Sequence, residues 1–163
     1  MDASPTPPDS SPRPVIGWRE WLSLPGLGIP GIKAKIDTGA RSSALHTHDY
    51  SLYETAAGER RVQFHLRPLP TRRWLELECD APVLAMREVK DSGGHIELRP
   101  FIETPVRLGG HEWNIEISLT NRESMRFRML LGRAAIRGRF VVDPGRSSVL
   151  GPKPIGVYPK RRP

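Results

Sequence analysis

The chain has 163 residues, and 25 Lys and Arg against 18 Asp and Glu give it a formal net charge of +7 at pH 7. This length suits one ordinary hydrophobic core, and no run approaches the roughly 18 apolar residues of a membrane-spanning helix. The single cysteine, Cys79, excludes an internal disulfide and agrees with a cytoplasmic protein.

The chain begins with a segment of low complexity. Residues 1–14, MDASPTPPDSSPRP, are rich in proline, serine and aspartate and lack the basic and apolar regions of a signal peptide. We expect a disordered leader there, followed by one domain over residues 15–157. Residues 158–163 form a basic tail, and the whole stretch from Lys153 onward is too rich in proline and charge to pack, except as an interface strand.

An alternating segment then leads directly into an Asp-Thr-Gly sequence. Apolar and charged residues alternate from Ile32 to Ile36, which predicts a strand with one buried face. The strand delivers Asp37 into Thr38 and Gly39, so a carboxylate stands at the tip of a rigid strand, beside a small hydroxyl and a glycine. An aspartic peptidase presents its catalytic carboxylate in this way. The alternative is an ordinary turn that closes a hairpin, because these residues are common turn formers.

Further short strands separated by glycine and proline predict a mainly β fold, a compact barrel or sandwich. In the strand that ends at Cys79, the cysteine occupies the apolar phase and is interpreted as a small buried hydrophobe, with a nucleophile as the alternative. One short helix is expected over residues 132–138. The predicted strands and hairpins are residues 62–66, a hairpin of 86–90 with 95–99, and a hairpin of 101–108 with 113–120.

Four segments together are similar to one known family. They are KIDTGARSSALH, REVKDSGGHIELRP, ISLTNRESMRFRMLLGRAAI and GRFVVDPGRSSVLG, spread over about residues 15–157. They resemble the RimB-like retropepsin-like aspartic peptidases of bacteria, often labelled "ATP-dependent zinc protease". That family is associated with RimK-like ATP-grasp ligases, which add glutamates to a ribosomal protein, and a trimming peptidase activity is what the resemblance implies.

The resemblance also implies a fold and residue roles. It implies a closed β barrel in which Asp37 is catalytic, Thr38 ties two active-site loops together and Gly39 helps to seat the catalytic water. Arg133 would brace the active-site loop through its fork of donors. The residues expected to support the site are Ala40, Gly132 and Arg133.

In retropepsins a glycine-tipped hairpin closes over the substrate. Our candidate for this flap is the tip at Ser92, Gly93 and Gly94. Hairpin tips also carry glycine for backbone reasons alone, and residues 50–75 are a competing flap or an insertion.

An aspartic peptidase needs two carboxylates that share one proton. Because the chain contains one Asp-Thr-Gly, the economical prediction is a homodimer in which each copy supplies Asp37. The rival source is Asp143, whose surroundings, VDPGRSSVL, repeat IDTGARSSAL with one residue deleted. We interpret that repeat as a structural turn, since Pro144 removes a backbone donor and Asp-Pro-Gly is a common turn sequence.

The family label makes a metal site worth testing. His46 and His48 stand two residues apart beside Asp49, and on a strand they would share one face and bind zinc if a third ligand arrived. No His-Glu-x-x-His, paired-cysteine or Walker-type sequence occurs. We therefore expect no cofactor, with a zinc hydrolase as the alternative and no support for ATP.

Arginine carries much of the positive charge, which attracts polyanions such as nucleic acid, ribosome or acidic peptides. Arginines near a carboxylate pair would suit an acidic or glutamylated peptide substrate, and a merely soluble basic surface is the alternative. The four tryptophans do not alternate with basic residues, so a nucleic acid is not expected as the main partner. A non-catalytic module that binds ribosome or RNA is the third hypothesis. The arginines in question are Arg60, Arg61, Arg67, Arg72, Arg73, Arg122, Arg126, Arg128, Arg133, Arg137, Arg139 and Arg146.

Overall fold

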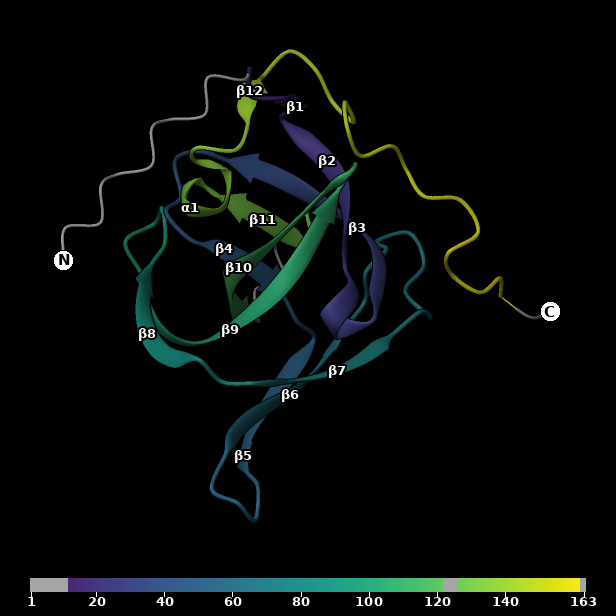
Figure 1. The fold of residues 1–163 in the computed structure, drawn as a ribbon. Helices are drawn as coiled ribbons and strands as arrows, with labels where there is room; N and C mark the ends of the chain where they lie inside the picture. The colour runs from purple at the N-terminus through teal and green to yellow at the C-terminus, as the bar shows by residue number, and fades with distance from the viewer. Residues whose placement is uncertain (1–11, 122–125, 162–163) are drawn as a thin grey trace, which may run out of the picture.

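A computed structural model describes residues 12–121 and 126–161 of the chain (Figure 1). Most of the predicted leader, residues 1–11, lies outside the described residues. The elements are β1 Val15–Gly17, β2 Arg19–Leu24, a 3-10 turn Pro25–Leu27, β3 Ile29–Asp37, β4 Ser43–His46, β5 Asp49–Glu54, β6 Arg60–Leu66, β7 Leu77–Pro82, β8 Ala85–Lys90, β9 Ile96–Leu108, β10 His111–Thr120, β11 Met129–Gly132, α1 Arg133–Ile136 and β12 Val141–Asp143.

The main sheet has seven strands in the order β10, β4, β11, β3, β2, β9, β8. Within β3, Ile32, Ala34 and Ile36 are buried while Lys35 is exposed, so the alternation in the sequence sets which face meets the core. β11 lies parallel to β3, whereas β2 pairs with β3 in the antiparallel sense. The mainly β fold and the helix within residues 132–138 are thereby confirmed.

The pairings of this sheet also lead back to their start, because β9 pairs with β10 along Leu108 to Phe101. β2 and β9, by contrast, share a single register pair, Ser23 with Arg107. A closed barrel requires continuous strand pairing between all neighbouring strands. The structure therefore establishes a mainly β fold. Closure into a barrel stays a prediction.

The two predicted hairpins after residue 85 share one strand. β9 runs unbroken over 13 residues and pairs first with β8, from Ile96 to Phe101, and then with β10. The sequence had suggested a break at Pro100. Proline is tolerated there because β9 changes its pairing partner at Phe101. Pro100, which has no N–H to donate, thus lies in a part of β9 that is paired on one side only.

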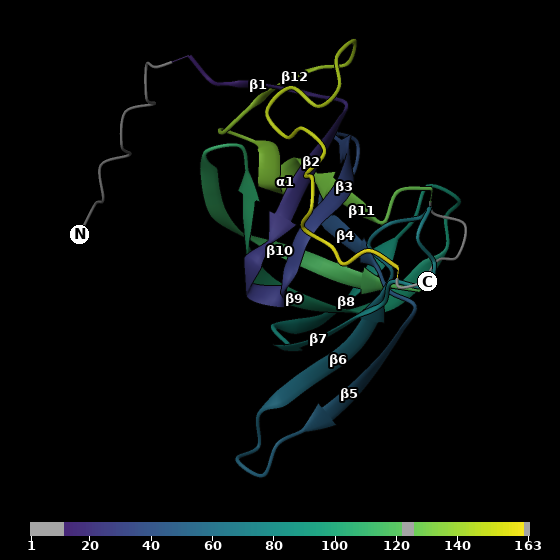
Figure 2. The same cartoon turned by 90° about the vertical axis from the view of Figure 1, so that its right-hand side faces the viewer.

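Three strands, β5, β6 and β7, form a separate antiparallel sheet whose β5–β6 hairpin projects from the body of the molecule (Figures 1 and 2). Cys79 lies on the core side of β7 with 4% of its surface exposed, and burial raises the pKa of its thiol to about 12. The interpretation of Cys79 as a buried hydrophobe is confirmed. A thiol with this pKa is not a nucleophile at neutral pH.

The C-terminal segment is held on the sheet by a buried carboxylate. Glu20 is fully buried on β2, and its oxygens accept hydrogen bonds from the backbone N–H groups of Val149, Leu150 and Gly151 at 2.6–2.9 Å. A buried carboxylate is tolerated when several donors satisfy it. Glu20 thus fixes a segment about 130 residues away in the sequence.

The predicted unpacked tail is partly corrected by the structure. The Tyr158 hydroxyl hydrogen-bonds with the backbone of Gly31 in β3, and burial raises its pKa to about 12. Pro154 packs closely against Gly31, because a Cβ placed on Gly31 would lie only 2.5 Å from the Cγ of Pro154. A proline and an aromatic ring can pack on a sheet through side-chain contacts, without strand hydrogen bonds. The composition of the tail therefore did not predict this packing.

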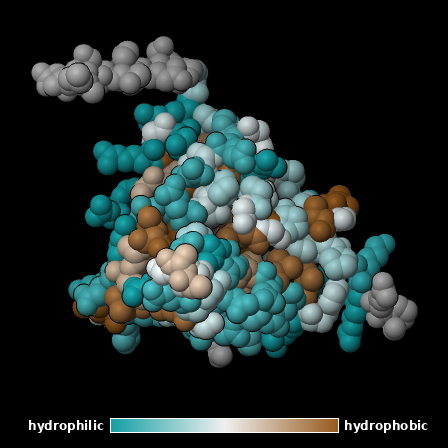
Figure 3. Space-filling model, turned by 60° about the horizontal axis from the view of Figure 1, so that its bottom comes forward, coloured by the Kyte–Doolittle hydropathy of each residue, from teal (hydrophilic) through white to brown (hydrophobic). Residues whose placement is uncertain are grey.

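Exposed apolar residues are scattered. On the face shown in Figure 3, hydrophilic side chains dominate and hydrophobic residues form separate small patches. No helix among the described residues is both long and apolar enough to cross a bilayer.

Candidate active site

Asp37 is the last residue of β3 and is held by its own turn. Its Oδ1 accepts hydrogen bonds from the backbone N–H of Gly39 at 3.0 Å and of Ala40 at 3.2 Å. The carboxylate is half-buried, so it is fixed in orientation and still open on one side. This arrangement places a preoriented acceptor at the end of a rigid strand.

The neighbouring strand β11 and the residue that follows it support the Asp37 turn. Gly132 at the end of β11 is the register partner of Asp37, and the next residue, Arg133, donates its backbone N–H to Ala40 O at 2.7 Å. The Arg133 side chain also reaches the turn, since Nη1 donates to Thr38 O at 3.0 Å. The structure therefore brings Asp37, Thr38, Ala40, Gly132 and Arg133 together at one turn.

Gly132 occupies a position with no room for a side chain. A Cβ there would lie 2.5 Å from both C and O of Ser42 and 2.9 Å from Ser43 N. Its N–H donates to Ser43 Oγ at 3.0 Å, and Ser118 Oγ donates to Ser43 O at 3.2 Å. Ser43 and Ser118 are buried residues that the sequence analysis missed, because no local signal distinguishes a bridging serine from any other.

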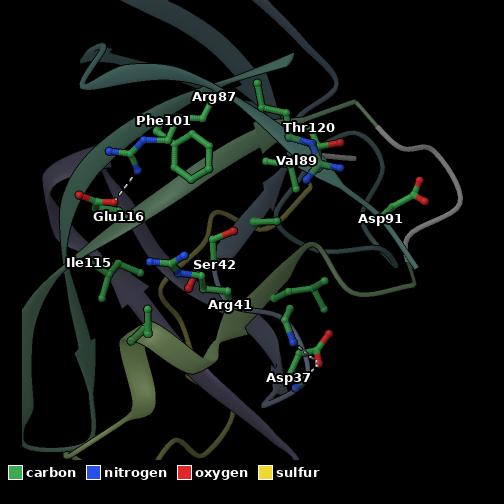
Figure 4. A pocket seen from close by; sticks show the side chains of 18 of the residues that line it. Asp37, Arg41, Ser42, Arg87, Val89, Asp91, Phe101, Ile115, Glu116 and Thr120 are labelled. Atoms are coloured by element: carbon green, nitrogen blue, oxygen red, sulfur yellow. Dashed lines mark hydrogen bonds and ion pairs between the residues drawn. The ribbon is translucent and has the colours of Figure 1, made fainter. Parts of the chain in front are cut away.

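A cavity of about 1360 Å³ opens beside Asp37 (Figure 4). The Asp37 turn forms one margin, and the β8–β9 hairpin and β10 form the other. Its lining includes Gly39, Ala40, Arg41, Ser92, Phe101 and Arg139. Of the described residues, those from 45 to 86 do not line this cavity, so residues 50–75, the competing candidate for the flap, lie outside it.

An ion pair joins the hairpin to β10 on the cavity margin opposite the Asp37 turn. Arg87 Nη1 lies 2.8 Å from Glu116 Oε2, and the Arg87 guanidinium stacks over Phe101 with 4.9 Å to the ring centre. At the tip of this hairpin Ser92 reaches the lining, whereas Gly93 and Gly94 belong to the turn itself. Gly94 has φ +83°, a conformation that favours glycine, so the backbone explanation for this tip holds as well.

Asp143 stands in a loop built like that of Asp37. Asp143 Oδ1 accepts from Gly145 N at 2.9 Å, and Trp18 N donates to Arg146 O at 2.8 Å, as Arg133 N does to Ala40 O. The strand partner of Asp143 is again a glycine, Gly17. The repeat seen in the sequence is thus a repeated loop structure. Asp143 does not line the cavity, which favours the structural interpretation of that loop.

The two histidines considered for zinc do not form a ligand pair. His46 ends β4 and is 7% exposed, whereas His48 follows the strand and is exposed, so the two do not share a strand face. Among residues 12–121 and 126–161, no three His, Cys, Asp or Glu side chains are grouped to hold a metal ion. The described residues therefore offer no ligand set that fits a zinc centre.

His65, on the projecting sheet, offers a test of the structure by titration. Its Nδ1 lies 2.7 Å from Asp49 Oδ1, and this hydrogen bond raises the pKa of His65 above its usual 6.5. The pair's contribution to stability is therefore complete below about pH 6.5 and lost as pH rises through the raised pKa. NMR of the ring protons should show a midpoint above 6.5 that falls in Asp49→Asn. An unchanged midpoint in that variant would contradict the contact.

Two comparisons with known proteins cover most of the described chain. The family model described as "Retropepsin-like aspartic endopeptidase RimB" matches residues 15–153. A crystal structure of a Legionella pneumophila protein of unknown function is similar, with a TM-score of 0.69 and 27% identity over 84% of this chain and 98% of that chain.

Longer proteins contain a similar segment. Proteins named probable alpha-L-glutamate ligase are 44% identical over 137 residues in Shewanella halifaxensis and 42% identical over 137 residues in Desulfotalea psychrophila. These matches cover 84% of this chain, which spans about 30% of the length of the curated relatives. The family match covers the Asp37 turn, the hairpin and the Gly132–Arg133 support alike, and the chain belongs to the RimB-like family of retropepsin-like aspartic endopeptidases.

Proposed function

We propose that this chain is an aspartic peptidase that acts as a homodimer, in which Asp37 of each copy contributes one of two catalytic carboxylates. The observation that carries the proposal is the fixed, half-exposed Asp37 carboxylate at the margin of a cavity. Among the described residues one such turn faces the cavity, because the similar loop at Asp143 lies outside it. A second copy is then the source of the second carboxylate.

The proposed reaction needs no group beyond these carboxylates and water. One carboxylate takes a proton from water as the water oxygen attacks the peptide carbonyl carbon, while the protonated partner donates a hydrogen bond to the carbonyl oxygen. The tetrahedral intermediate then collapses, the C–N bond breaks, and the amine leaves with a proton from the pair. Both carboxyl groups end in their starting protonation states.

Acidic, glutamate-rich peptides are the proposed substrates. Arg41 and Arg139 line the cavity and form no ion pair among the described residues, so a substrate carboxylate can pair with them. The name of the longer relatives, probable alpha-L-glutamate ligase, also suggests glutamate chemistry near this domain. A peptidase that trims glutamates added by a ligase, in the cytoplasm, is consistent with both features.

The β8–β9 hairpin is the proposed flap. Its strands line the cavity opposite Asp37, and the Arg87–Glu116 pair fastens it to β10. Both side chains are about half exposed, so the pair can open at little energetic cost. Opening would admit the substrate and closing would exclude water.

Cleavage of a defined peptide tests the proposal. Purified protein is incubated with a peptide extended by glutamates and with a matched peptide extended by glutamines, each with and without EDTA, and the products are read by mass spectrometry. We expect cleavage of the glutamate peptide that EDTA leaves unchanged. Loss of cleavage with EDTA would indicate a metal mechanism, and equal cleavage of both peptides would remove the acidic preference.

A further inference from the structure

A concentrated basic surface lies outside the cavity. Its members come from β2, β3, the loop between β6 and β7, the segment before β11 and the C-terminal segment. We call it the basic surface, and it consists of Arg19, Lys33, Arg67, Arg73, Arg126, Arg128 and Lys153.

Ring contacts bring Arg19 and Lys33 together on the Trp18–Phe127 pair, and the electrostatics group the other cations with them. Burial, followed by the positive charges of Arg19, Arg126 and Lys153, lowers the pKa of Lys33. Burial, followed by the charges of Arg67 and Arg73, lowers the pKa of Arg128. Arg126 and Arg128 flank Phe127, so one short segment joins the two groups.

The basic surface has no counter-charge within the described part of the chain. None of its members forms an ion pair with a described acidic residue, whereas Arg61, Arg87, Arg99 and Arg107 each pair with a carboxylate. The Nε groups of Arg19, Arg67 and Arg128 are buried and have no hydrogen-bond acceptor among the described residues. Buried donors without an acceptor are rare in folded proteins, and the positive charge of these side chains remains open to an external anion.

Aromatic rings lie among these cations. Trp18 and Phe127, far apart in the sequence, meet edge to face with 5.9 Å between ring centres. Arg19 lies over Trp18 at 4.8 Å and Lys33 over Phe127 at 5.8 Å. The fold therefore interleaves aromatic and basic side chains, although the sequence analysis found no such pattern along the chain.

We propose that the basic surface binds the sugar-phosphate backbone of a single-stranded nucleic acid. Phosphate oxygens and peptide carboxylates both accept from guanidinium N–H groups. Unpaired bases also stack on aromatic rings, which a polyglutamate peptide cannot do. RNA and single-stranded DNA present the same chemistry here. The proposal does not depend on the proposed peptidase activity, because none of these seven residues lines the cavity.

The test uses charge reversal at exposed members of both groups. Binding of fluorescent oligouridine RNA, of the matching single-stranded DNA and of an RNA duplex, each about 20 units long, is measured by anisotropy at several salt concentrations. We expect Arg73→Glu with Arg126→Glu to weaken binding of single strands by about tenfold or more and to flatten the salt dependence. Replacement of the same two residues by lysine should retain most of the binding.

The control carries the same change in net charge. Arg60 and Arg137 are exposed arginines outside the basic surface and the cavity lining, so Arg60→Glu with Arg137→Glu should alter affinity less than about threefold. Circular dichroism checks that each variant folds. Equal weakening by both double variants, or none by either, would overturn the proposal. Tighter binding of polyglutamate than of RNA, lost only in the first variant, would assign the surface to acidic polypeptides.

Discussion

Asp37→Asn is expected to reduce hydrolysis of a glutamate-extended peptide by roughly 10² to 10⁴-fold, the usual contribution of a general acid–base group. An amide cannot take the proton that water loses. The substitution keeps Oδ1, which accepts the N–H groups of Gly39 and Ala40, so the turn should keep its shape. Product formation by mass spectrometry measures the loss, and thermal unfolding checks that the fold is retained.

The chain provides a matched control for this substitution. Asp143→Asn makes the same chemical change in a loop with the same Asp-to-glycine hydrogen bond, outside the cavity, and should leave activity near that of the wild type. Similar losses in both variants would show that the two aspartates act together within one copy.

A covalently linked pair of chains tests the homodimer. If the two copies share one site, a linked dimer with Asp37→Asn in one half should lose as much activity as one with both halves altered. Half of the wild-type activity would mean instead that each copy carries a complete site.

Gly132→Ala is expected to lower the free energy of unfolding by about 1–3 kcal/mol, because the new methyl group meets backbone atoms that cannot move independently. The nearest are C and O of Ser42, 2.5 Å from the Cβ position. Since Gly132 is paired with Asp37, the strain should also displace the catalytic turn and reduce peptide hydrolysis. Urea unfolding measures the stability, and the cleavage assay measures the second effect.

Gly110→Ala is the corresponding control. Gly110 lies in the turn between β9 and β10, and no heavy atom outside its own neighbours would lie within 4 Å of a Cβ there. Its unfolding free energy should stay within about 0.5 kcal/mol of the wild type. If Gly132→Ala behaved in the same way, the close approach of Ser42 to β11 would be incorrect.

The sequence by itself determined the local features of this protein. Alternation from Ile32 to Ile36 predicted β3 and its buried face, and turn residues placed the β8–β9 hairpin and the Asp37 turn. These features depend on side-chain periodicity and on backbone preferences over a few residues, so they can be derived without knowledge of the fold. The family resemblance added the roles expected of Gly132 and Arg133.

The tertiary structure decided which distant residues meet. It placed Asp37 at the cavity and Asp143 outside it, although their loops are alike in sequence. It set Ser43 against Gly132 and brought Trp18 against Phe127 within the basic surface. Such contacts join residues about 90 or more positions apart, and they follow from the packing of the whole sheet. The local sequence around each residue carries no information about that packing.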